Sequence, residues 1–114
     1  MIFGLPDETS EMMLESVRFT LNLDVQSFKF HPLYVVKRTA LANDLMKGSF
    51  TPISETAYID MVVKAIQLLP DHIMVQRISA GIRDETLLEP SWCYTKHQQM
   101  FNLRQALLIQ GLRY

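Results

Sequence analysis

Hydrophobic and polar residues alternate between Val25 and His31, and this alternation predicts a half-buried strand because successive side chains point to opposite faces. Phe28 and Phe30 share one face. The other face carries the polar side chains of Ser27, Lys29 and His31. If both faces of this strand were covered, Lys29 and His31 would have to face a cavity or a partner. These two residues are therefore the first site candidates.

Apolar residues at helical spacing predict four helices along the chain. The first begins at Thr9 or Ser10 and places Met13, Val17 and Leu21 in one stripe. The later helices also have candidate caps, which are Thr39 for 40–47, Ser54 for 55–69, and Thr95 with Gln98 as a capping box for 95–110.

Two more strands are predicted, at Ile2–Phe3 and at Ile73–Ile78, and in the latter Arg77 shares a face with Ile73 and Val75. Residues 79–90 have no clear period, so we expect a long loop with one turn around 84–88. Strands alternating with helices through short links are typical of a parallel α/β unit. We expect one domain over residues 1–114, with about three parallel strands and helices on one face.

Two segments in a fixed order and separation carry a family resemblance. Met1–Thr9 joins a strand end to a Gly-Leu-Pro turn and an acidic helix start, and Lys29–Thr39 follows as a strand of Lys-Phe-His type. Together they resemble the C-terminal part of a radical SAM core domain. The chain is most similar to an uncharacterised iron–sulfur oxidoreductase family related to the Elongator catalytic subunit, and more distantly to the oxygen-independent coproporphyrinogen oxidases. The resemblance extends to Trp92, Lys96 and Gln110–Gly111.

The resemblance implies a C-terminal fragment of a partial (β/α)6 TIM-type barrel, with the two motifs on its fifth and sixth strands. It implies that the full-length parent uses S-adenosylmethionine and a [4Fe-4S] cluster to act on a small molecule or an RNA. The residues it implies for S-adenosylmethionine are Gly4, Leu5, Pro6, Asp7, Lys29 and His31. The residues proposed for the substrate are Lys29, His31 and Arg77.

The chain departs from the family pattern at three points. Asp7 stands where the family usually has glycine, and Arg38 where a Gly-Thr pair is usual, and a β-carbon disfavours the positive φ that glycine allows. The cluster motif Cys-x3-Cys-x2-Cys is absent, and Cys93 alone cannot hold a cluster. We therefore expect no cofactor on the isolated chain and no catalysis by it. The alternative is a non-catalytic α/β binding or assembly module that acts alone.

Each candidate side chain also has a structural interpretation. His31 could be a core histidine bonded to a backbone carbonyl, while the stem of Lys29 covers apolar surface. The Gly4–Glu8 segment could be a tight turn before a helix, with Asp7 or Glu8 favouring the helix start. Arg77 could pair with Glu15, Asp24 or a carboxylate of the following loop.

Composition excludes several functional classes. A formal charge of −1 with 48% hydrophobic residues provides no bulk attraction for nucleic acid or for an anionic membrane, so we expect no DNA or membrane partner. The sequence contains no apolar run near the ~20 residues that span a bilayer. A single cysteine fits a reducing compartment, which favours the cytoplasm. Cys93, His72 and His97 lack metal-ligand spacing, so we expect no metal site.

A barrel that begins at its fifth strand leaves the edge next to Ile2–Phe3 without a neighbour. Few charged residues near this edge would prevent strand pairing between chains. We therefore expect a homo-oligomer that forms through the exposed sheet edge.

Overall fold

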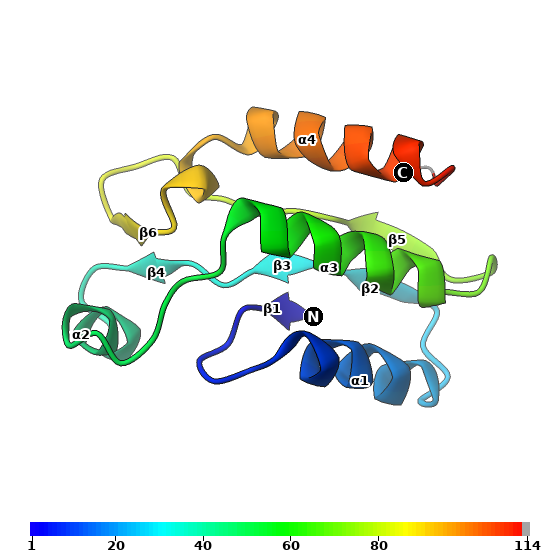
Figure 1. Cartoon of the computed structure of the whole chain (residues 1–114), viewed down its shortest axis with the longest axis horizontal. Helices are drawn as coiled ribbons and strands as arrows, with labels where there is room; N and C mark the ends of the chain where they lie inside the picture. The colour runs from blue at the N-terminus through cyan, green and yellow to red at the C-terminus, as the bar shows by residue number, and fades with distance from the viewer. Residues whose placement is uncertain (113–114) are drawn as a thin grey trace.

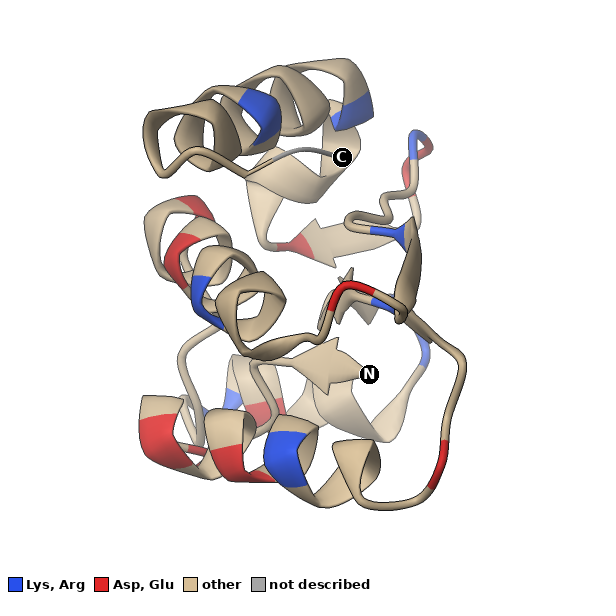
Figure 2. Ribbon diagram, turned by 90° about the vertical axis from the view of Figure 1, so that its right-hand side faces the viewer, with Lys and Arg blue, Asp and Glu red and all other residues tan. Residues whose placement is uncertain are grey.

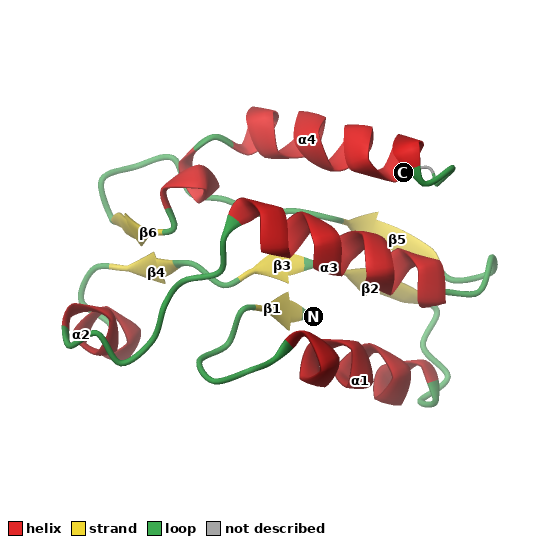
Figure 3. Ribbon diagram, viewed as in Figure 1, coloured by secondary structure: helices red, strands yellow, loops and turns green. Residues whose placement is uncertain are grey.

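The computed structural model describes residues 1–112 and arranges short parallel strands behind three long helices (Figure 1). Figure 3 shows the same view by element type, with the strands confined to the middle layer and one end of the molecule. In chain order the elements are β1 (Ile2–Phe3), α1 (Ser10–Leu21), β2 (Ser27–Lys29), β3 (His31–Pro32), β4 (Val35–Val36), α2 (Ala40–Met46), α3 (Glu55–Leu68), β5 (Met74–Arg77), β6 (Leu87–Glu89), the 3-10 helix η1 (Ser91–Tyr94) and α4 (Lys96–Ile109).

The central layer is parallel, as the order of strands and helices predicts. β1 pairs with β3, with Ile2 opposite His31, and β2 pairs with β5. Only Phe30 separates β2 from β3, and its amide donates to the carbonyl of Arg77 at 2.7 Å. β2 and β3 are therefore one strand in the middle of a three-stranded parallel layer. The mixed α/β class is confirmed.

The alternation along β2 and β3 decides which face is covered. Phe28 and Phe30 are buried, whereas Lys29 is exposed and His31 is only half-buried. The Phe30 ring stacks on Phe3 at a centroid distance of 5.5 Å and on Phe28 at 5.6 Å. The core that these rings share with the helices consists of Phe3, Met13, Val17, Phe28, Phe30, Tyr58, Met61, Val62, Val63, Ala65, Ile78, Leu103 and Leu107.

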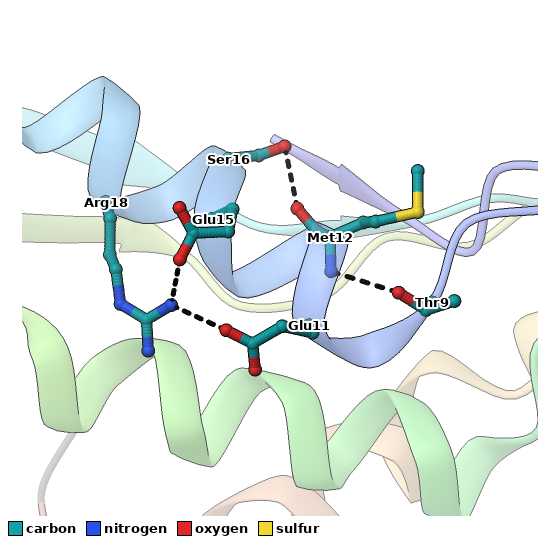
Figure 4. Close-up of polar contacts among 6 residues, drawn as sticks. All are labelled: Thr9, Glu11, Met12, Glu15, Ser16 and Arg18. Carbon is teal, nitrogen blue, oxygen red and sulfur yellow. Dashed lines mark hydrogen bonds and ion pairs between the residues drawn. The ribbon is translucent and has the colours of Figure 1, made fainter.

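The helix starts follow their capping residues, except at α4. The Thr9 hydroxyl accepts from the Met12 amide at 3.2 Å, and Arg18 contacts both Glu11, at 3.0 Å, and Glu15 along α1 (Figure 4). The predicted N-caps of α2 and α3 also accept from the amide three residues on.

The capping box predicted for α4 is wrong. The Thr95 side chain makes no capping hydrogen bond to the helix. Gln98 donates instead to Asn102 one turn further along, at 3.1 Å, which is an ordinary pair at i, i+4 within a helix.

The structure also corrects the long loop predicted for residues 79–90. β4 and β6 form an antiparallel pair in which Val35 lies opposite Glu89. This pair lies beyond the carboxyl ends of the parallel strands, next to α2 (Figure 1). The predicted turn is present, because the amide of Thr86 donates to the Asp84 carboxylate at 2.8 Å immediately before β6. Strands of two or three residues are too short to show a period in the sequence.

Charged residues on the helices are interspersed (Figure 2). Lys64 and Asp60 form an ion pair of 2.8 Å along α3, in addition to the Arg18 contacts on α1. No helix within residues 1–112 is long and apolar enough to cross a membrane.

Candidate functional site

The turn that follows β1 is built around a glycine. Gly4 has φ +106°, and a β-carbon there would lie 2.9 Å from the side chain of Ile53. Packing against Ile53 by itself therefore explains the need for glycine at this position. The chain then reverses at Asp7 and begins α1 after the Thr9 cap.

Asp7 and Arg38 stand where the family pattern has glycine, and both have the left-handed backbone that glycine adopts most readily. Asp7 has φ 63° and Arg38 has φ 66°. Holding a residue with a β-carbon in this conformation costs about 1–2 kcal/mol relative to a glycine at the same position. The chain thus keeps the backbone geometry that the family's glycines would allow.

A cavity of 400 Å³ lies beside this turn. One wall is Gly4–Ser10, a second is formed by Phe50, Thr51 and Ile53, and the floor is formed by side chains of α1 and α3 that include Met61. Gly4, Leu5, Pro6 and Asp7, the four turn residues predicted to contact S-adenosylmethionine, all line it. Because α1 and α3 pack on the covered face of the sheet, the cavity lies on the helical side.

Glu8 also lines this cavity, although the predicted set of site residues did not include it. Its Oε1 atom is buried without a hydrogen-bond partner, although the side chain as a whole is partly exposed. Desolvation raises the pKa of the Glu8 carboxyl above its usual value. An unpartnered carboxylate oxygen in a cavity accepts a hydroxyl or amine donor, and the adenosyl group of S-adenosylmethionine supplies both. Glu8 thus offers an acceptor of the kind that this part of the cofactor would need, and only the tertiary packing of the turn buries its oxygen.

Lys29 and His31 lie on the other side of the sheet. Their face of β2 and β3 is the one opposite Phe28 and Phe30. The residues predicted for the cofactor are thus divided: the turn residues line the cavity, and the two strand residues project from the uncovered face.

Arg77 joins Lys29 on that uncovered face. The prediction that Arg77 shares a face with Ile73 and Val75 in a partly buried position is wrong. The β2–β5 register is irregular after Phe28, so Arg77 rather than Gln76 pairs with Lys29, and Arg77 is exposed. Such an irregularity re-aims the following side chain.

His31 is held by two local contacts. Its Nδ1 lies 2.6 Å from the carbonyl oxygen of Pro32, and its ring stacks on Tyr34 at 5.3 Å. A carbonyl only accepts, so Nδ1 carries the proton and donates, and Nε2 is the second polar atom of the ring. The backbone bond matches the structural interpretation of His31, and its half-exposed position on the open face matches the functional one.

The residues at hand do not fit an iron–sulfur cluster. Cys93 is fully buried, and burial, followed by the nearby charge of Glu55, raises the pKa of its thiol to about 12. A cluster needs thiolates, and Cys93 is a neutral thiol at physiological pH. His72 and His97 lie in different parts of the fold, in the turn before β5 and in the first turn of α4. No group of three potential metal ligands occurs among residues 1–112.

Trp92 anchors η1 to the segment before α3. Its indole Nε1 donates to the carbonyl of Ile53 at 3.0 Å, and its ring lies 5.5 Å from that of Tyr58. The Tyr58 hydroxyl in turn donates to the carbonyl of Ile78 at 2.7 Å. This network fixes Ile53, and Ile53 supports the turn at Gly4.

Residues 25–108 match the Radical_SAM C-terminal domain, which is most of the chain. The chain belongs to this radical SAM family. It is also similar to the uncharacterized protein YtqA of Bacillus subtilis, with 29% identity over 110 residues that cover 96% of this chain and 34% of YtqA. Protein YhcC of Escherichia coli is 30% identical over 113 residues, which cover 99% of this chain and 37% of YhcC. This radical SAM chain thus spans about a third of the length of the curated relatives it matches.

Proposed function

We propose that this chain is the C-terminal part of a radical SAM iron–sulfur oxidoreductase and contributes contacts to S-adenosylmethionine and to the substrate. The observation that carries the proposal is the cavity beside the Gly4 turn, at the carboxyl end of a parallel strand, with Glu8 and its unpartnered Oε1 atom among the lining residues. Parallel α/β folds bind their ligands at these ends. The family membership supplies the reaction class, and the relation to the Elongator and coproporphyrinogen oxidase enzymes belongs to the same proposal.

In the parent protein this chain closes a partial (β/α)6 barrel. The central strand would face the barrel interior with Lys29 and His31, because α1, α3 and α4 already cover its opposite face. When bound, the cofactor and its cluster supply the radical chemistry. The residues of this chain bind and orient the cofactor and the substrate. Gly4–Asp7 and Glu8 bind the adenosyl part, and Lys29, His31 and Arg77 bind the substrate.

A chimera in which this chain replaces the matching 113 residues of YhcC tests the binding part of this proposal. Equilibrium dialysis of the chimera against labelled S-adenosylmethionine should show saturable binding that Glu8→Ala weakens and Glu15→Ala, an exposed α1 variant, leaves unchanged. The isolated chain should bind no S-adenosylmethionine. After anaerobic reconstitution with iron and sulfide, the chain should show no absorption from thiolate-to-iron charge transfer. A stoichiometric cluster on the chain, or S-adenosylmethionine binding that Glu8→Ala leaves unchanged, would contradict the assignment.

A stand-alone binding module is the second candidate, and the continuous aromatic core favours it. Phe3 and Phe30 are fully buried without any other chain. A module of this kind would bind a partner and no S-adenosylmethionine, so the dialysis experiment separates the two.

We also propose that the isolated chain self-associates along the β1 edge. Ile2 is 45% exposed there, and the neighbouring helix α1 exposes Met12 at 52% and Phe19 at 67%. Together they form an apolar flank next to an unpaired strand edge in the described chain. Light scattering on a dilution series should show a dimer or larger species, and a monomer across the micromolar range would refute this proposal.

A further inference from the structure

The uncovered face of the sheet places two cations side by side. Lys29 and Arg77 are register partners on β2 and β5, and partner strands lie about 4.8 Å apart. Both side chains are exposed. Like charges directly opposite one another destabilise a sheet, so this arrangement acts against stability unless an anion lies between them.

Within residues 1–112, no ion pair joins Lys29 or Arg77 to an acidic side chain. Among residues 1–112, the ion pairs are those of Arg18 with Glu11 and Glu15 and of Lys64 with Asp60, all on helices. Among the residues that the structure describes, neither Lys29 nor Arg77 belongs to one of these ion pairs. The expected structural pairing of Arg77 with Glu15, Asp24 or a loop carboxylate is absent from these ion pairs.

The register shift between β2 and β5 brings Lys29 and Arg77 opposite each other. In a regular ladder Gln76 would follow Val75 opposite Lys29, and Arg77 would return to the helical face. The shift after Phe28 turns Arg77 to the open face instead. His31 follows two residues after Lys29 on the same face, so three nitrogen-bearing side chains line one stretch of the sheet.

We propose that Lys29 and Arg77, with His31 beside them, bind the phosphate group of a phosphate-bearing substrate. A guanidinium presents a planar fork of donors and an ammonium a compact charge, and together they match a doubly charged tetrahedral oxyanion. The inference rests on the proposed function, in which this face is the substrate side of the barrel. The carboxylate of the amino-acid part of S-adenosylmethionine is the other oxyanion source, and it carries a single charge.

The test is a titration of the full 114-residue chain with inorganic phosphate at constant ionic strength, followed by amide chemical shifts. We expect saturable shifts at residues 29, 31 and 77. Lys29→Gln and Arg77→Gln should each weaken binding about tenfold, as the loss of one charge-assisted contact does. Lys47→Gln, at the end of α2, is the matched control and should leave binding unchanged.

A second arm titrates methionine in place of phosphate. The proposal predicts at least tenfold weaker binding of this carboxylate. Absent or non-saturable phosphate shifts, equal weakening by Lys47→Gln, or equal affinity for methionine would each overturn it. Neither arm uses a cluster or S-adenosylmethionine, so failure here is distinguishable from failure of the radical SAM assignment.

Discussion

Neighbouring residues on opposite faces of the central strand should respond differently to the same truncation. Phe30 is fully buried and stacks on two other phenylalanine rings, whereas His31 is half-buried on the open face. Replacing a buried Phe by Ala costs about 3–5 kcal/mol, and stacked ring pairs contribute about 0.5–1.5 kcal/mol each beyond buried area. We expect Phe30→Ala to lie in the upper half of that range, and His31→Ala to cost less than about 1 kcal/mol.

Urea unfolding at 25 °C measures both changes. With an m-value of about 1.5–2 kcal/mol/M, Phe30→Ala should lower the midpoint by about 2–3 M. A domain of this size has roughly 5–15 kcal/mol of stability in all, so Phe30→Leu serves as a milder second variant if the alanine form does not fold. Phe101→Ala, with a ring that is 58% exposed on α4, is the control and should change stability by less than about 0.5 kcal/mol. Equal losses for Phe30→Ala and His31→Ala would refute the two-faced strand.

Three further substitutions test local features. Gly81→Ala should cost roughly 1–3 kcal/mol in urea unfolding, because its β-carbon would lie 2.3 Å from the carbonyl oxygen of Cys93, and an unchanged midpoint would contradict that packing. Burial raises the pKa of Glu8, so its ionisation reduces stability as pH rises through and above the ordinary carboxyl range. Glu8→Gln should therefore raise the Tm at pH 7 and leave it unchanged at pH 3, where both states are protonated. Arg38→Gly should stabilise the chain by about 1 kcal/mol by relieving its positive φ, and a loss of stability would show that its side chain contributes more than the strain costs.

The sequence predicts those features that depend on period and local capping. The alternation at Phe28 and Phe30 is strong enough to locate the covered face, and Thr9 and Ser54 locate two helix starts. A parallel order of strands follows from the helices between them. These predictions concern the chain over a few residues, where side-chain spacing alone decides the outcome.

The features that the sequence missed arise from tertiary packing. Arg77 faces outward because of a register shift between two strands, and neither strand shows it alone. Glu8 lines one cavity together with Phe50 and Ile53, which lie some 45 residues away in sequence, so only the folded chain brings these residues together. Arg38 shows that a non-glycine residue can hold a left-handed backbone when the surrounding fold requires it.

The most direct test of the central claim is a chimera in which this chain replaces the matching 113 residues of YhcC. After anaerobic reconstitution and reduction with dithionite, the chimera should cleave S-adenosylmethionine to methionine and 5′-deoxyadenosine, and Glu8→Ala within it should reduce that cleavage. Unaltered YhcC that is active under the same conditions serves as the reference. A folded chimera that holds a cluster yet neither binds nor cleaves S-adenosylmethionine would contradict the account and favour the stand-alone module.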